Sequence, residues 1–473
     1  MQPQQEVAPA PPRNALRNIA LYGGSALLVS GSNFLTVPLL VALLGADGFS
    51  VWSLLEPLLL IFLPVAGLGI NFGLMNAGRN SAADAHSAAE TLVLSHVALA
   101  ALVGCSIGVA SAATGTSVPL AMLLSLVVAT EGSIVFFVAL FRAQDRPLSF
   151  AAMEGGRTFL TLLIVGAAVL FSYEHFDISS YLLLRATTAV VSLAATIILV
   201  GTKLRPSWTA TLDAIKYGAP IVTGSLIVAG LSSLDRYVLS YTGHAASLAS
   251  YTAHTKLAQT LSIATGPFFM WYAPKAIQQL HHGNAGHPFL ISATSFAFLF
   301  SMMAGGSLLI LSPSIWRVLF PTLAFDLHLF ASMIFGMCAF SLAPTLGIGC
   351  LQQGKTFLAP TLTLGALIVA LTAAVAGGHL FGELGVSVGR SIGFIAYAAL
   401  FLAATMLGPK VRYPAARYVA LYAAAFFVAF WLALFTGSHG ILASVLVASG
   451  YCLLIVCAGA FTLSRSLLID ETA

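Results

Sequence analysis

The segment DAIKYGAPIVTGSLIVAGLSSLDRYVLSYTGHAASLASYTAHTKLAQ, residues 213–259, contains two long apolar runs joined by a short polar turn. Charged side chains lie within or beside these runs, among them Lys216, Asp235, Arg236 and Lys256. A charge near the bilayer centre costs about 2.5–3.5 kcal/mol on insertion scales, so we expect such side chains to face the interior of a helix bundle. For Lys216, near a helix end, snorkelling to the membrane surface is the better interpretation. For the other three, structural pairing is the alternative to a role in transport.

The composition of the whole chain is that of a polytopic membrane protein. Of its 473 residues, 59% are hydrophobic and only 8% are charged, which excludes an ordinary water-soluble domain. The net charge of +4 is dispersed, with no basic run, so no nucleic-acid partner is expected. The five cysteines fall inside apolar runs without metal-ligand spacing. We interpret them as packing residues and predict no metal site.

Apolar runs long enough to cross a bilayer recur along the chain. A helix needs about 20 apolar residues to span the hydrocarbon. On that rule the sequence predicts an all-α fold of about fourteen transmembrane helices joined by short loops: 17–44, 49–75, 87–111, 117–141, 149–172, 178–201, 213–240, 248–274, 288–312, 327–352, 357–377, 384–407, 415–436 and 440–463.

The distribution of basic residues gives the expected topology. Arg and Lys concentrate in cytoplasmic loops of membrane proteins. Arg142, Arg146, Arg205 and Arg417 flank alternate ends of the predicted helices, whereas the intervening loops contain Asp47, Asp177 and Glu383; Arg317 is the exception. This alternation predicts an even number of helices, with both termini in the cytoplasm.

A weak internal repeat divides the predicted helices into two groups. LRNIALYGG at 16–24 is similar to LDAIKYGAP at 212–220, and each begins a long helix that is followed by one containing Gly and Pro. Because six helices separate the two beginnings, the repeat is parallel. The prediction is two six-helix lobes, residues 13–205 and 206–409, followed by two additional helices and a short cytoplasmic tail in 410–473. Residues 1–12, rich in Pro and Gln, are expected to be a disordered cytoplasmic tail.

Several stretches carry a resemblance to a known family. They are LDRYVLSYTGHAASLASYTAHTKLAQ at 234–259, VALLGADGFSVWSLLEPLL at 41–59, GIGCLQQGKTFLAPTL at 347–362 and GELGVSVGRSIGFIAY at 382–397. The chain resembles bacterial polysaccharide flippases, the Wzx-type branch of the multidrug/oligosaccharidyl-lipid/polysaccharide exporter superfamily. The resemblance implies two lobes around a cavity that opens alternately to the two sides of the bacterial inner membrane. It also implies a substrate in which an oligosaccharide is joined by pyrophosphate to a polyprenyl lipid.

Five cations within the predicted helices are candidates for binding such a substrate. A pyrophosphate needs fixed positive charges along its route, and the planar guanidinium group binds phosphate in a bidentate manner. The candidate cavity cations are Arg157, Arg185, Arg236, Lys256 and Arg390. Arg185 and Arg390 lie at similar depths in the last helix of each lobe, and we hypothesise that both face one central cavity.

Acids buried in the same helices should be either paired or protonated. Glu131, near the middle of its helix, is expected to pair with a cavity arginine or to take up a coupling H+ or Na+; pairing is the stronger interpretation. Asp235 adjoins Arg236, and Glu56 and Glu154 are weaker candidates. Glu154 is three residues from Arg157, which indicates a local ion pair.

Tyr251, Thr255 and Gln259 recur at helical spacing and form a polar stripe. Such a stripe suits sugar contacts and hydrogen bonds between helices equally well. GCLQQGKT at 349–356 matches the phosphate-binding loop pattern, but that loop requires a strand before it and a helix after it. An apolar span precedes it here, so no nucleotide and no other cofactor is predicted.

Three classes of function remain in view. The favoured one is a flippase that moves a polyprenyl-pyrophosphate-linked glycan to the periplasmic leaflet for surface polysaccharide synthesis, with polysaccharide polymerase and export proteins as further partners. The alternative is an ion-coupled multidrug or cation exporter of the same superfamily, expected to have twelve helices and an acidic cavity. A membrane enzyme would need large extramembrane loops with acid pairs or metal ligands, which this sequence lacks, so the chain is not expected to be an enzyme.

Overall fold

The computed structural model describes residues 15–78, 81–113, 116–171, 175–201, 204–281, 287–348, 357–407, 411, 413–437 and 440–470. Within these ranges every regular element is helical, and eleven helices are long and apolar enough to cross a membrane. The expected tail at 1–12 and the GCLQQGKT motif at 349–356 lie outside the described residues.

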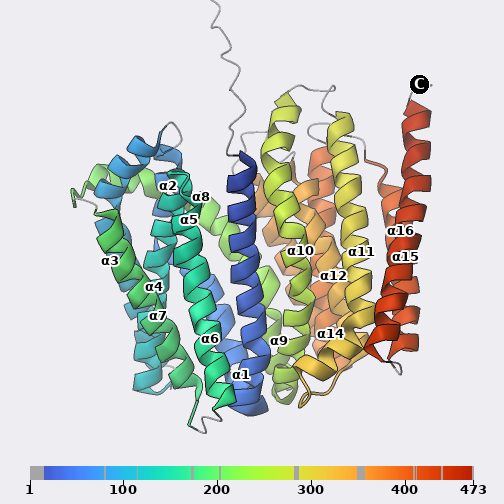
Figure 1. Cartoon of the computed structure of the whole chain (residues 1–473), viewed down its shortest axis with the longest axis horizontal. Coiled ribbons are helices and arrows are strands. Elements are labelled where there is room, and N and C mark those ends of the chain that lie inside the picture. The colour runs from blue at the N-terminus through green and yellow to red at the C-terminus, as the bar shows by residue number, and fades with distance from the viewer. Residues whose placement is uncertain are drawn as a thin grey trace, which may run out of the picture.

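The first lobe contains the helices up to residue 200. Its longest helix, α1, changes direction at Gly45, whose φ of 65° and ψ of −179° are not helical. Figure 1 shows that α1 begins at the same end of the bundle as α2, so its two halves cross the bundle in opposite directions. The elements are α1 (Ala15–Ala66), α2 (Ile70–Ala77), α3 (Ala82–Ala113), α4 (Val118–Ala143), α5 (Pro147–Phe150), a π-helical turn (Ala151–Gly155), α6 (Gly156–Leu170) and α7 (Ile178–Val200).

The second lobe repeats this plan, and two further helices follow it. α14 changes direction at Gly382, with φ of 61°. The elements are α8 (Trp208–Ser233), α9 (Asp235–Tyr241), α10 (Leu248–His281), α11 (His287–Leu319), α12 (Leu327–Leu346), α14 (Leu358–Leu407), α15 (Ala415–Thr436) and α16 (Ile441–Asp470). The last two pack mainly on α11.

Counting the two halves of α1 and of α14 separately, and adding α10, the described residues provide fourteen membrane-length segments. The start of α1 and the end of α16 lie at one end of the bundle (Figure 1). We call this end the terminal face and the opposite end, with the turns at Gly45, Gly243 and Gly382, the distal face. The all-α, fourteen-helix fold predicted from the sequence is confirmed.

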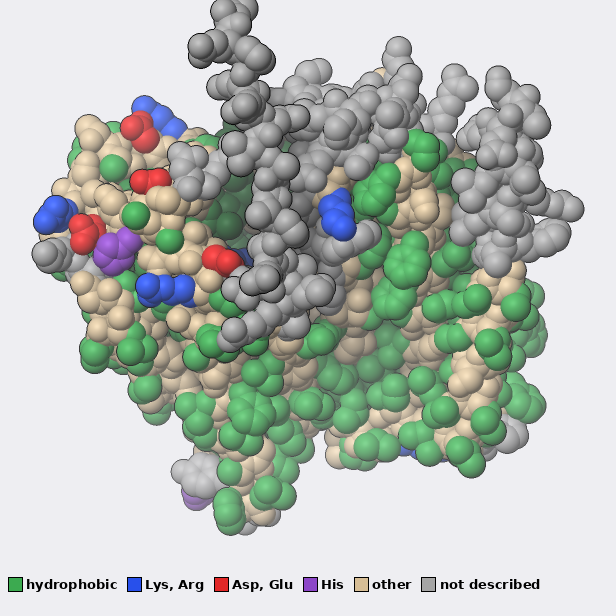
Figure 2. Space-filling view, turned by 45° about the horizontal axis from the view of Figure 1, so that its top comes forward, with side chains coloured by type: hydrophobic (Ala, Val, Ile, Leu, Met, Phe, Trp, Pro, Cys, Tyr) green, Lys and Arg blue, Asp and Glu red, His purple; other side chains and the backbone are tan. Residues whose placement is uncertain are grey.

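Charged side chains mark the terminal face. In Figure 2 blue and red side chains gather near the top over the first lobe, and the flank below them is hydrophobic and tan. Arg142 and Arg417 lie at helix ends on this face, whereas Asp47 and Asp177 lie at the distal ends of their helices. Glu383 lies in α14 directly after its turn rather than in a loop. This separation fits a multi-pass membrane protein.

The repeat is visible in the turns that join the first two helices of each lobe. Gly45 and Gly243 both have left-handed backbones, with φ of 65° and 90°. A left-handed conformation is costly for a residue with a Cβ, so glycine is favoured where the chain reverses in this way. The two turns place corresponding helix pairs side by side at the centre of the bundle.

α8 contacts both lobes. Near its start, Gly218 lies so close to Gly69 that a Cβ on either residue would overlap the other's backbone. Thr211 also donates a hydrogen bond to Ser95 of α3, 2.9 Å between hydroxyl oxygens. Further along, α8 packs on α14. The first part of α8 therefore belongs with the first lobe and its end with the second.

Candidate functional site

A cavity of about 450 Å³ lies between the two lobes. Both halves of α1 and α7 form one side, and α8, α10 and α12 form the other. Its polar lining comes from hydroxyl, amide and charged side chains: Ser30, Asn33, Thr36, Glu56, Tyr181, Arg185, Ser232, Lys256, Gln259, Thr260 and Ser262.

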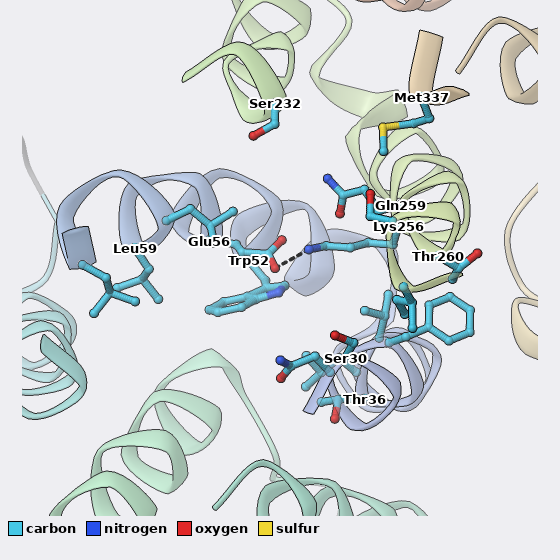
Figure 3. A pocket seen from close by; sticks show the side chains of 18 of the residues that line it. Ser30, Thr36, Trp52, Glu56, Leu59, Ser232, Lys256, Gln259, Thr260 and Met337 are labelled. Atoms are coloured by element: carbon cyan, nitrogen blue, oxygen red, sulfur yellow. Dashed lines mark hydrogen bonds and ion pairs between the residues drawn. The ribbon is translucent and has the colours of Figure 1, made fainter. Parts of the chain in front are cut away.

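Three charged residues line this cavity: Glu56, Arg185 and Lys256. Figure 3 shows the Lys256 side chain reaching from α10 across to the Glu56 carboxylate on α1, with Gln259 and Thr260 on the same helix as Lys256. Both side chains are largely buried, at 15% and 16% exposed. The pair therefore joins the two lobes at the cavity wall.

A second cation from the other lobe binds the same carboxylate. Arg236 Nη1 donates to Glu56 Oε2 at 2.8 Å and also to the Ser53 carbonyl at 3.3 Å. The neighbouring Tyr237 hydroxyl donates to the Leu54 carbonyl. We call Glu56, Arg236, Tyr237 and Lys256 the inter-lobe latch. Since Ser53, Leu54 and Glu56 follow the turn at Gly45 by about two to three helical turns, the latch holds the lobes together in the distal half of the bundle.

Arg236 has unused hydrogen-bonding capacity. Its side chain is 0% exposed, yet its Nε and Nη2 atoms have no partner among the described residues. Two cations thus share the single Glu56 carboxylate in the latch. A buried cluster with surplus positive charge favours a further anion nearby.

A separate ion cluster is buried inside the first lobe. Glu131 accepts hydrogen bonds from Arg185 Nε and Nη2, at 2.9 and 2.6 Å, and from Arg157 Nη1 at 3.0 Å. Arg157 also pairs with Glu154 at 3.5 Å. The π-helical turn Ala151–Gly155 ends two residues before Arg157, and such turns are frequent at functional sites. The two hydrogen bonds from Arg185 to Glu131 fix Arg185 at the edge of the cavity.

The second lobe contains the remaining cluster. Asp235 Oδ2 accepts from Arg390 Nη1 at 3.0 Å and from the Tyr251 hydroxyl at 2.7 Å. Arg390 also donates to Thr255 Oγ1 at 3.2 Å. Asp235 and Arg390 are each 3% exposed. This network ties α9, α10 and α14 together, so Tyr251 and Thr255 make hydrogen bonds between helices here.

The structure therefore separates the sequence candidates into two groups. Glu56, Arg185, Lys256 and Gln259 line the cavity. The others are not part of its described lining: Glu131, Glu154, Arg157, Asp235, Arg236, Tyr251, Thr255 and Arg390. Arg185 and Arg390 occupy similar positions in their lobes, but only Arg185 belongs to the described cavity lining.

Sequence reasoning missed several cavity residues. Asn33 and Ser30 lie in the first half of α1. The Asn33 amide, in the middle of an apolar run, could have indicated a residue that faces a cavity. The Arg185 guanidinium lies over the Trp52 ring, with its Cζ atom 5.5 Å from the ring centroid. The Trp52 and Tyr181 rings pack edge-on, with their centroids 4.9 Å apart. Aromatic side chains give no such signal, because they are common throughout the predicted spans.

Comparisons with known proteins identify relatives at the level of fold. No family model and no curated protein matches the chain. Among solved structures, an inward-facing multidrug resistance MATE family transporter of the MOP superfamily has a TM-score of 0.57 at 13% identity, covering 83% of this chain and 94% of that one. A point mutant of the Vibrio cholerae MATE transporter VcmN has a TM-score of 0.60 at 15% identity, covering 84% and 97%. The lipid II flippase MurJ, in an inward closed conformation, has a TM-score of 0.58 at 13% identity, covering 95% and 98%.

Proposed function

We propose that this protein is a flippase of the MATE/MurJ-like fold that moves a polyprenyl-pyrophosphate-linked oligosaccharide between membrane leaflets by alternating access. The observation that carries the proposal is the charge of the cavity. Its described charged lining is two cations and one carboxylate, and that carboxylate is already bound by Lys256 and Arg236. Such a cavity suits an anionic headgroup, since cations held in a partly dehydrated site attract phosphate oxygens strongly.

The wall also offers groups for sugar hydroxyls. Asn33, Gln259 and Ser262 contribute amide and hydroxyl groups from the two sides of the cavity. Tyr181 and Trp52 add ring faces beside them. Polar groups of this kind, placed between apolar walls, are typical of pockets that bind a polar ligand in a fixed orientation.

The length of the matched chain supports a flippase as well. The MATE structures described above match 83% and 84% of this chain, whereas the lipid II flippase matches 95%. α15 and α16 follow the two lobes in this chain. They exceed the twelve helices that are expected of the exporter alternative. We place the protein in the bacterial inner membrane with both termini cytoplasmic, acting beside polysaccharide polymerase and export proteins.

The test is a leaflet assay in proteoliposomes. A polyprenyl-pyrophosphate-linked sugar is placed in both leaflets, and the fraction accessible to an external glycan-modifying enzyme is followed with time. The wild-type protein should bring nearly all of the substrate within reach of the enzyme. Lys256→Gln should slow the exchange at least tenfold, as expected for loss of about 1.4 kcal/mol or more of anion binding. Lys216→Gln, which removes a cation that is 78% exposed, is the matched control.

The cation-exporter alternative makes the opposite prediction in a dye assay. A lipophilic cation such as ethidium should not be transported, because the cavity offers no unpaired carboxylate among its described residues. Gradient-driven ethidium transport together with an inactive leaflet assay would replace the flippase by an exporter of the same fold.

A further inference from the structure

The inter-lobe latch contains one contact that a substrate can replace. The Glu56 carboxylate belongs to α1 in the first lobe, and both cations that bind it belong to the second lobe. Lys256 Nζ and the carboxylate both border the cavity. An anion arriving in the cavity therefore meets Lys256 at the point where Lys256 holds the lobes together (Figure 3).

The two cations of the latch differ in how firmly they are fixed. Arg236 is fully buried and is bonded to both Glu56 and the Ser53 carbonyl. Lys256 has the Glu56 carboxylate as its hydrogen-bond partner and retains some exposure, at 15%. A lysine ammonium is a point charge on a flexible stem, and it can exchange anionic partners without the geometric demands of a guanidinium. Lys256 is therefore the cation of the latch that can exchange its partner, whereas Arg236 stays bound to Glu56 and Ser53.

The charge balance allows such an exchange. With Lys256 transferred to another anion, Glu56 keeps Arg236 as a partner at 2.8 Å, so no carboxylate is left buried and unpaired. In contrast, Arg185 is bound through two nitrogens to Glu131 within its own lobe. An anion that binds Arg185 draws no contact away from the second lobe. Of the two cavity cations, only Lys256 links anion binding to the junction between the lobes.

We infer that the pyrophosphate of the substrate opens the distal side of the transporter by taking Lys256 from Glu56. This inference rests on the proposed function and adds the step that couples binding to the conformational change. The anion binds better to the state in which Lys256 has left Glu56, so its arrival removes one of the two cations that join the lobes at Glu56 and shifts the equilibrium toward separation at the distal face, against the remaining contacts of Arg236. An empty transporter keeps the latch closed.

The experiment measures the separation of the lobes at the distal face. Spin labels are attached at Asp47→Cys in the first lobe and Ala246→Cys in the second, both exposed near the distal turns, in a protein whose native cysteines are replaced by alanine. The distance distribution is recorded by double electron–electron resonance in nanodiscs, with geranylgeranyl pyrophosphate or the uncharged geranylgeraniol added. Binding of radiolabelled geranylgeranyl pyrophosphate is measured on the same samples.

Three results are expected. In the otherwise wild-type protein the pyrophosphate shifts the distribution to longer distances, and the alcohol does not. In Lys256→Gln the longer distances are already partly populated without any probe and the pyrophosphate adds no further shift, while Lys216→Gln behaves as wild type. In Glu56→Gln/Lys256→Gln, which leaves the net charge unchanged, the longer distances are populated without any probe. This double variant, judged with its monodispersity and melting temperature, separates loss of the latch from misfolding.

The failures of the two proposals are distinguishable. If the labelled pyrophosphate binds and the distance distribution stays unchanged, the latch exchange is overturned and the proposed anion-binding cavity stands. If the pyrophosphate does not bind to the wild-type protein, the proposed function itself fails, and the latch inference fails with it. A shift produced equally by the uncharged alcohol assigns the opening to the lipid chain and also overturns the exchange.

Discussion

At the scale of single residues, the acids buried inside this bundle act first as fixed partners of cations. Glu56, Glu131 and Asp235 each bind at least one guanidinium group at 3.0 Å or less. Removing one member of a buried pair leaves the other charged and desolvated, which is far more destabilising than never having had the pair. Glu131, shared by Arg157 and Arg185, should be the most sensitive of the acids.

Glu131→Gln is predicted to lower the free energy of unfolding by about 3–5 kcal/mol, because two buried guanidinium groups lose their carboxylate. Thermal or denaturant unfolding in detergent measures this loss. Glu154→Gln is the control: that carboxylate is 23% exposed and lies 3.5 Å from Arg157, so its removal should cost less than about 1 kcal/mol. A Glu131→Gln protein as stable as the wild type would contradict this structural role of Glu131.

Local ion pairs and distant ones differed in how well they could be predicted. The Glu154–Arg157 pair follows from a spacing of three residues on one helix. Glu56 and Lys256 are 200 residues apart, and their contact depends on how the lobes pack. Sequence reasoning identified the charges that had to be buried, but not which of them share a carboxylate, because helix rotation and lobe packing decide that.

At the scale of elements, the start of α7 is stabilised by a well-defined cap. Asp177 Oδ1 accepts hydrogen bonds from the Ser180 hydroxyl at 2.7 Å and from the Ser180 N–H at 2.8 Å. These bonds to Ser180 hold the pKa of Asp177 below its ordinary value. Since α7 carries Arg185 to the cavity, this cap contributes to the position of the site.

Asp177→Ala is predicted to lower the free energy of unfolding by about 0.5–2 kcal/mol at neutral pH, because the first turn loses its side-chain acceptor. A group whose pKa is depressed in the folded state stabilises above its unfolded pKa, and that stabilisation is lost as the pH falls through the folded pKa. The difference in melting temperature between wild type and variant should therefore be constant near neutrality and shrink below about pH 4. Asp213→Ala, 77% exposed, should show neither effect.

The close approach of α2 and α8 gives a second prediction at this scale. Gly218→Ala is predicted to destabilise the protein by about 1–3 kcal/mol, since the added Cβ would overlap the backbone of Gly69. Gly450→Ala in α16 is the matched control, because nothing lies within 4 Å of its added Cβ. That control should be neutral or stabilising by up to about 1 kcal/mol. Equal melting temperatures for the two variants would contradict the tight contact.

At the scale of the whole molecule, the number and grouping of the helices follow from the sequence. Span lengths and the positions of Arg and Lys predicted an even number of about fourteen helices, because each reports a constraint that the bilayer imposes directly. The weak repeat between 16–24 and 212–220 divided these helices into two lobes and two added helices. The turn at Gly382 within α14 lies between the predicted spans 357–377 and 384–407, whereas the interruption at 67–69, between α1 and α2, falls inside the predicted span 49–75. That interruption depends on packing between segments, which the hydrophobic pattern does not encode.

If the protein is the flippase proposed above, the pairing of its buried acids also predicts how lipid exchange is driven. With Glu56, Glu131 and Asp235 each bound to a cation, we expect imposed gradients of H+ or Na+ to leave the leaflet exchange rate unchanged. Proteoliposomes with and without each gradient measure this, at a fixed membrane potential. A rate that follows either gradient would make one of these carboxylates the coupling site, and Glu131→Gln should then abolish the dependence.

The attachment of α8 to both lobes has a further consequence for how this protein could be inhibited. Its beginning is fastened to the first lobe through Gly218 and Thr211, and its end packs on α14 of the second. Any rocking of one lobe against the other must therefore deform this one helix, around Pro220 and Gly224. Under the proposed flippase function, a small molecule bound beside that stretch from the lipid side would block this deformation without resembling the substrate. A change in the glycan would then not relieve the inhibition.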